Sequence, residues 1–216
     1  MKLYRIVGAC AASLLVMAPS ALAQKWEFGG GVGGSFYLSQ DVTNDSTSAK
    51  AGITTNVASG VWLDENLANK WGGEVRFDYQ LGDLSLKSGS TSTHFGAQTY
   101  GLHYDVMWHA TPREAKVRPF LAAGAGIKVY RGTGQPGSEP QPLNQYALLT
   151  QGNQLEALLS LGAGVKWQIA RSLQLRLEVH DYITPFPTQI IAPNVGSHAP
   201  IILQNIVPLI AIAYTF

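Results

Sequence analysis

The chain has 216 residues, and its 15 lysines and arginines against 14 aspartates and glutamates give a formal net charge of +1. This near-neutral charge offers no electrostatic case for binding nucleic acid. Only 13% of the residues are charged while 23 are glycine, so the chain is poor in charge for the surface of a soluble protein. Its length suits one domain.

Residues 1–23 have the features of a secretory signal peptide. Two basic residues precede an apolar run over 6–17, and Ala21-Leu22-Ala23 offers the small residues that signal peptidase recognises. The run is too short for a membrane-spanning helix. We therefore expect cleavage after Ala23 and a single domain over 24–216. Cleavage also removes the single cysteine, Cys10, and with it any disulfide or cysteine metal site.

Apolar and polar residues alternate with period two along the rest of the chain, a pattern that predicts strands. In the clearest segment, Val75, Phe77 and Tyr79 share one face, and the opposite face carries Glu74, Arg76, Asp78 and Gln80. A helix would scatter these charges around its circumference, whereas a strand places them on one side. In chain order, the predicted strands are 26–38, 53–63, 71–81, 95–108, 119–129, 155–169, 173–180 and 206–216.

The connections between the predicted strands alternate in length. Short connections fall near 64–70, 109–117 and 169–172, and long ones near 39–50, 82–94, 131–153 and 184–205. This alternation places all long loops at one end of an up-and-down barrel, as in outer-membrane barrels with short periplasmic turns. The sequence therefore predicts an all-β fold, an eight-stranded antiparallel up-and-down transmembrane β-barrel.

The distribution of charge indicates which face of the sheet meets lipid. A soluble lipocalin-like barrel needs a wetted exterior, but the polar faces here hold mostly glycine and alanine with few charges, which suits a narrow lumen. Aromatic residues near the strand ends are typical of an interfacial girdle: Trp26, Trp71, Trp108, Trp167, Tyr214 and Phe216. Trp62 is out of phase with its strand. We expect the apolar faces to meet lipid.

Three segments resemble the small outer-membrane barrels of the OmpA/OmpX/Ail type. They are 118–126, the run 161–166 with 175–179, and the C-terminal segment 210–216. The resemblance covers 24–216, without the peptidoglycan-binding domain of full-length OmpA-type proteins. It implies an address in the bacterial outer membrane, with outer-membrane lipid and lipopolysaccharide as partners. It also implies that Ile210, Ile212, Tyr214 and Phe216 form the signal read by the barrel-assembly machinery.

The predicted lumen carries a set of charged side chains. We expect them to pair, because an isolated buried charge is costly: Glu74, Arg76, Asp78, Asp105, Lys128, Glu156, Lys166, Arg176 and Glu178, with Glu27, His103 and His180 nearby. Such a network would either stabilise a closed barrel or act as a gate that leaks small solutes. Replacing Gln80 or Gln174 with alanine is expected to change the stability of the barrel little.

Catalytic motifs are weak in this sequence. Two glycine patterns, over 29–34 and 132–137, match a dinucleotide fingerprint as strings, but neither opens a helix in a strand–helix–strand unit. Some eight-stranded barrels deacylate lipid A with Ser, His and a carboxylate. Here no serine follows Glu178, His180 and Asp181 in the position that such deacylases show. The five histidines lack metal-ligand spacing. We expect no enzyme activity, no cofactor and no metal.

The long loops are the expected place for specific contacts. The segment 185–203 is rich in apolar residues, and we expect it to fold back over the barrel mouth, with contact to a surface ligand as the alternative. The sequence thus predicts a non-enzymatic outer-membrane barrel that contributes to envelope structure and presents loops for surface interaction. A narrow channel or small-ligand transporter is the alternative, and a periplasmic soluble barrel that binds an apolar ligand is a third hypothesis.

Overall fold

The computed structural model describes residues 26–44, 47–135 and 140–216, so the expected signal peptide and its cleavage site lie outside the described residues. The strands are β1 (Trp26–Leu38), β2 (Gln40–Asn44), β3 (Thr47–Ile53), β4 (Asn56–Glu65), β5 (Trp71–Ser88), β6 (Thr91–His109), β7 (Val117–Gly132), β8 (Ala147–Leu149), β9 (Gly152–Ala170), β10 (Leu173–Pro185), β11 (Ile191–Pro193), β12 (Ser197–His198) and β13 (Ile202–Thr215). Within the described ranges, no helix is long and apolar enough to cross a membrane.

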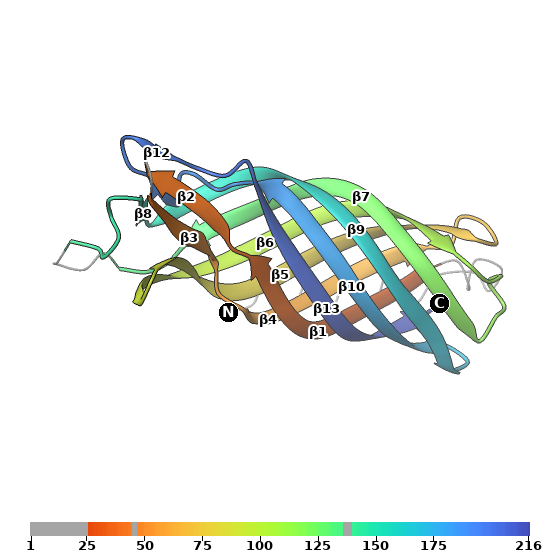
Figure 1. Ribbon diagram of the computed structural model, residues 1–216. Coiled ribbons are helices and arrows are strands. Elements are labelled where there is room, and N and C mark those ends of the chain that lie inside the picture. Colours follow the sequence, from red (N-terminus) through yellow and green to blue (C-terminus); the bar gives the residue numbers. More distant parts are fainter. Residues whose placement is uncertain (1–25, 45–46, 136–139) are drawn as a thin grey trace, which may run out of the picture.

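Eight of these strands close into a barrel, in the order β1-β4-β5-β6-β7-β9-β10-β13 (Figure 1). Each pair of neighbours is antiparallel, and β13 pairs back onto β1 with Phe28 opposite Tyr214. At the end of this seam, the amide of Phe216 donates to the carbonyl of Trp26 at 3.0 Å. All eight predicted strands have a counterpart in this ring, which confirms the predicted barrel. Closure leaves no sheet edge facing lipid, where unpaired backbone groups are costly.

The two faces of the barrel wall have the polarity that the alternation predicts. On β5, Phe77 is exposed on the outer face, whereas Glu74 and Arg76 are buried in the lumen. On β10, Leu177 is 51% exposed, and the neighbouring Arg176 is buried. Trp62, out of phase in the sequence, is buried with the lumen residues. Apolar side chains therefore form a belt around the barrel, and the charges fill its interior.

Beyond this belt, the polarity of the two faces reverses. Strands β5 and β6 stay paired from Gly82 to Ser88 and turn tightly at Gly89, whose φ of 58° is the left-handed conformation that glycine tolerates. The predicted long loop over 82–94 is therefore wrong. In this extension Leu84 is 0% exposed on the inner face, whereas Asp83 and Lys87 are exposed on the outer face. An apolar inside and a polar outside are typical of a barrel wall that stands in water.

An apolar core closes the barrel at the end that carries the long loops. The hairpin β2–β3 extends the sheet beside β5, and β8 pairs with β11. The buried residues of this mouth core include Val42, Ile53, Leu84, Leu86, Phe95, Tyr146, Leu149, Phe186, Ile190, Ile191 and Leu203. The segment 185–203 thus folds back over the mouth as expected, through Ile190, Ile191 and Leu203. Val195 and Ile201 from the same segment remain exposed.

The reversal of polarity along the wall makes a testable distinction between two outward positions. Leu177→Arg puts a charge into the apolar belt and is expected to cost about 2–4 kcal/mol if it lies near the bilayer midplane. Asp83→Arg puts the same side chain on the outer face of the β5 extension and is expected to cost little. Urea unfolding of the barrel in lipid vesicles measures both. Equal losses in the free energy of unfolding for the two variants would mean that the apolar belt extends past Asp83.

Candidate functional site

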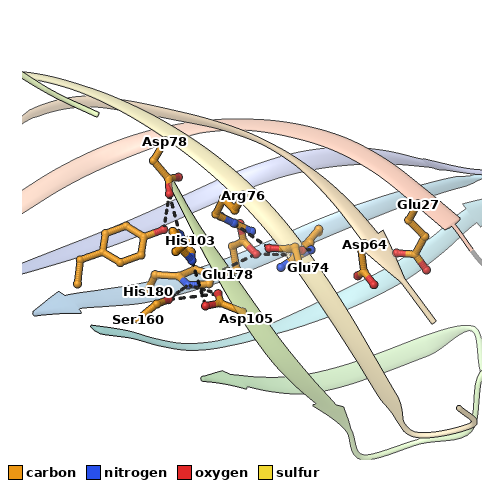
Figure 2. Close-up of polar contacts among 12 residues, drawn as sticks. Glu27, Asp64, Glu74, Arg76, Asp78, His103, Asp105, Ser160, Glu178 and His180 are labelled. Carbon is orange, nitrogen blue, oxygen red and sulfur yellow. Dashed lines mark hydrogen bonds and ion pairs between the residues drawn. The ribbon is translucent and has the colours of Figure 1, made fainter. Parts of the chain in front are cut away.

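The charged side chains of the lumen stack in successive tiers along the barrel axis. Figure 2 shows Glu27 and Asp64 at one end, Glu74, Arg76 and Glu178 next, and Asp78 with the two histidines beyond them. The first tier lies near the short turns. There, Lys166 Nζ donates to Glu27 Oε2 at 2.7 Å and also pairs with Asp64. One lysine therefore contacts two buried carboxylates, and Asn66 donates a further hydrogen bond to Glu27 at 3.0 Å.

The second tier is a closed ring of two arginines and two glutamates. Arg76 Nε contacts Glu74 Oε1 at 2.8 Å, and its Nη1 contacts Glu178 Oε1 at 2.7 Å. Arg176 contacts Glu178 Oε2 at 2.5 Å through Nε and also pairs with Glu74. Each acid therefore meets both bases. All four side chains are almost fully buried, so this ring is the most densely paired part of the lumen.

The indole of Trp62 lies in the second tier, close to both guanidinium groups. Their central carbons lie 4.5 Å (Arg76) and 4.6 Å (Arg176) from its ring centroid, which is cation–π geometry. The neighbouring strand makes room for it with Gly29, where a Cβ atom would lie 2.5 Å from the indole. The out-of-phase tryptophan is therefore a lumen residue that covers the arginine pair, and the glycine opposite is required by this close approach.

The third tier brings a serine, two histidines and carboxylates together. His103 contacts Asp78 and Asp105 at 3.0 Å each. Ser160 Oγ lies 3.4 Å from His180 Nδ1 and donates to Asp105 at 3.2 Å. Sequence reasoning missed Ser160, because its register opposite β10 becomes visible only in the folded sheet.

This grouping contains the residue types of a catalytic triad. Ser160 and His180 are both 0% exposed, and Tyr182 caps the tier by donating to Asp78 at 2.9 Å. A nucleophile needs access to its substrate. The tier therefore has the parts of a hydrolase site without its access.

The fourth tier departs from the expected pairing of charges. Lys128 is buried but has no carboxylate within ion-pair distance among the described residues. Its Nζ lies instead 4.9–5.5 Å from the ring centroids of Tyr37, Tyr130 and Tyr182. Glu156, on the same level, accepts a hydrogen bond from Gln154 rather than from a base. Aromatic rings and an amide thus take the place of the ion pairs predicted for these two residues.

Gln80 is the hydrogen-bonding centre of the fourth tier. Its Oε1 accepts from Tyr37 at 2.9 Å, from Asn205 at 2.5 Å and from Ser35 at 3.1 Å, and Lys128 lies 3.4 Å away. Removing the amide would leave the buried Asn205 Nδ2 without its acceptor, at about 1–3 kcal/mol, whereas Ser35 and Tyr37 would keep hydrogen bonds to Asn205 and Thr99. Gln80→Ala is therefore expected to lower the free energy of unfolding substantially, contrary to the expectation from the sequence.

A closed ring of eight strands with an apolar belt and a charged lumen defines a small β-barrel of the bacterial outer membrane. The chain belongs to the family of outer membrane protein β-barrel domains, whose family model matches residues 8–189. This membership supports an outer-membrane localisation.

Solved structures of outer-membrane proteins have the same fold. Neisserial surface protein A has a TM-score of 0.54 at 10% identity, covering 88% of this chain and 97% of its own. OprG from Pseudomonas aeruginosa has a TM-score of 0.52 at 13% identity, covering 89% of this chain and 97% of its own. The outer membrane protein AlkL has a TM-score of 0.51 at 10% identity, covering 92% of this chain and 94% of its own. Identities this low show the fold alone. No curated protein matches the sequence significantly.

The second tier predicts strong non-additivity between its members. Arg176→Met leaves Glu74 and Glu178 to share one base and is expected to cost about 3–5 kcal/mol. Adding Glu178→Gln restores the charge balance, so the double variant is expected to lose less than the sum of the single variants. Urea unfolding followed by gel mobility gives the double-mutant cycle, with Arg131→Met on the exposed end of β7 as the control. Additive losses would contradict a coupled ring.

Proposed function

We propose that this protein is a closed, non-enzymatic barrel that contributes to envelope structure and presents its outer loops for surface interaction. The observation that carries the proposal is the filling of the lumen. Four tiers of polar side chains occupy the membrane-spanning part, and the mouth core covers them at the long-loop end. Such packing favours a rigid support over a conduit for solutes.

The outer end has features suited to contact with other surfaces. Its extension has a polar exterior, and Val195 is 96% exposed on the loop between β11 and β12. An apolar side chain held in this way on a folded loop is a candidate anchor for a surface ligand. Because the segment that leads into this loop packs into the mouth core through Ile190 and Ile191, a ligand would meet a surface that is already ordered.

A pair of lysines on the extension supports lipopolysaccharide as a partner, although Asp41 of β2 also lies opposite one of them. Lys50 of β3 lies directly opposite Lys87 of β5, and both side chains are exposed. Like charges in opposite positions of two strands destabilise a sheet. A phosphate group of the outer leaflet between the two lysines would remove that repulsion, so this pair supports lipopolysaccharide as a neighbour of the extension.

Conductance in planar bilayers tests the closed barrel against the channel alternative. The folded protein is expected to show no steady conductance on the scale of an open porin, because buried side chains of the four tiers and the mouth core fill the described part of the lumen. A porin reconstituted in the same membranes is the positive control. A porin-scale current that changes with Lys128→Gln in the lumen, but not with Lys87→Gln on the exterior, would establish a channel through the barrel and overturn the proposal.

The C-terminal strand supports a second part of the proposal, recognition by the barrel-assembly machinery. Ile210, Ile212 and Tyr214 lie exposed along one face of β13, and the ring of Phe216 stacks on that of Tyr214 with centroids 6.4 Å apart. This apolar stripe ends at the seam with β1. An assembly factor that holds β13 before closure would find the stripe and the unpaired strand edge together.

Deletion of Phe216 tests this role. We expect far less assembled protein in the outer membrane of cells, but nearly normal refolding into detergent micelles, where no machinery reads the signal. Phe216→Tyr keeps an aromatic terminus and is the matched control. Heat-modifiable gel mobility reports the closed barrel in both settings. Equal loss in cells and in detergent would show that Phe216 acts through packing alone.

A further inference from the structure

A polar cavity of about 730 Å³ opens at the end of the barrel that carries the short turns. The turn between β6 and β7 contributes Arg113 and Lys116 to its wall, β7 contributes Arg118, and the turn between β9 and β10 contributes Arg171. The floor is the first tier of the lumen, with Glu27 and Lys166. The cavity thus lies at the end of the barrel opposite the mouth core.

The charge of this cavity is strongly unbalanced. Five cationic side chains line it, against the two carboxylates of Glu27 and Glu114, which gives a formal charge of +3. Lys166 is the one of the five that pairs with Glu27, and it also pairs with Asp64. Most of the positive charge around the cavity therefore has no internal partner in its lining, and concave walls concentrate such a field on small anions.

Arg118 carries hydrogen-bond donors that a ligand could satisfy. It is only 4% exposed, and its Nη1 donates to Asn66 at 3.0 Å. Its Nε and Nη2 have no hydrogen-bond partner among the described residues. Buried donors are rarely left unpaired, because the loss of hydration is not offset. Two unpaired donors of one guanidinium have the spacing that receives two oxygens of a single anion.

The basic turn is held over the cavity by backbone contacts. The amide of Arg113 donates to Asn69 Oδ1 at 3.0 Å, which ties the turn to the loop between β4 and β5. The carbonyl of Lys116 accepts from the amide of Gln168 on β9 at 2.8 Å. These side chains therefore project from a fixed turn, so part of the entropic cost of assembling a binding site is met by the fold.

We propose that this cavity binds a phosphate-bearing anion from the periplasmic side. A phosphate group has several anionic oxygens and can meet the Arg118 fork while Arg113, Lys116 and Arg171 neutralise its charge. Two sources supply this chemistry. The exposed rings of Trp71, Trp108 and Trp167 lie at the same end of the barrel, at the level of lipid headgroups, which makes a phospholipid headgroup one source. A soluble phosphorylated compound of the periplasm is the other.

The primary test is titration of inorganic phosphate into the refolded barrel in a neutral detergent, followed by phosphorus NMR line broadening. The unaltered protein is expected to bind phosphate, and Arg118→Gln is expected to weaken binding roughly tenfold or more. Arg131→Gln removes the same charge at the opposite end of β7, where the side chain is exposed, and is expected to change nothing. If Arg118→Gln does not fold, the double variant Lys116→Gln and Arg171→Gln removes two exposed cations instead, with the same expected loss.

A second arm distinguishes the two sources of phosphate. The barrel is extracted from phosphatidylglycerol-containing vesicles and examined by native mass spectrometry. Phospholipid retained by the unaltered protein and lost from Arg118→Gln identifies a headgroup site, and phosphate binding without retained lipid identifies a soluble ligand. The proposal is overturned if folded Arg118→Gln and the unaltered protein match in both arms, or if neither binds phosphate or lipid.

Discussion

A sheet in lipid cannot leave its backbone hydrogen-bonding groups unpaired, and the rest of this structure depends on that constraint. The pairing of β13 with β1 removes the last edges, and it fixes the number of strands and hence the width of the lumen. Eight strands enclose a space that side chains can fill. Every residue on the inner face must therefore pack against residues from the opposite wall, which brings Arg176 onto Glu74, 102 positions away in the chain.

The same wall passes through two solvents, and its side chains change faces accordingly. Up to Leu81 the outer face of β5 is apolar, whereas beyond Gly82 the buried residues are Leu84 and Leu86. The period-two alternation continues, but the apolar residues now occupy the inward positions of the strand instead of the outward ones. The polar tiers lie where the exterior is lipid, and the mouth core lies where the exterior is water. One strand thus contributes to an inside-out barrel and to an ordinary soluble barrel in succession.

The sequence predicted the fold well because burial on a two-sided wall leaves a period-two pattern in each strand. The sequence predicted the end of β5 poorly. From Leu84 onward the apolar residues lie on the inner face, and this change interrupts the pattern that identifies a lipid-facing strand. Partners across the lumen were not predictable, since they depend on register and on curvature around the whole barrel. Trp62 illustrates this: its phase marked it as exceptional, but its two guanidinium neighbours come from β5 and β10. For the same reason Lys128, expected in an ion pair, lies among tyrosines, and Ser160 was not connected with His180.

The two ends of the lumen differ in what can reach them. At the long-loop end, Tyr37 and Tyr130 beside Lys128 belong to the mouth core, which continues outward from them. At the short-turn end, Glu27 and Lys166 form both the first tier of the lumen and the floor of an open polar cavity. A soluble molecule that enters this cavity would meet the lumen network through its first tier. Because Lys166 also pairs with Asp64, an anion that drew Lys166 toward the cavity would weaken its ion pairs with two buried carboxylates. The proposed binding at the cavity would therefore be linked to the stability of the barrel through one side chain, at the opposite end of the barrel from the long loops.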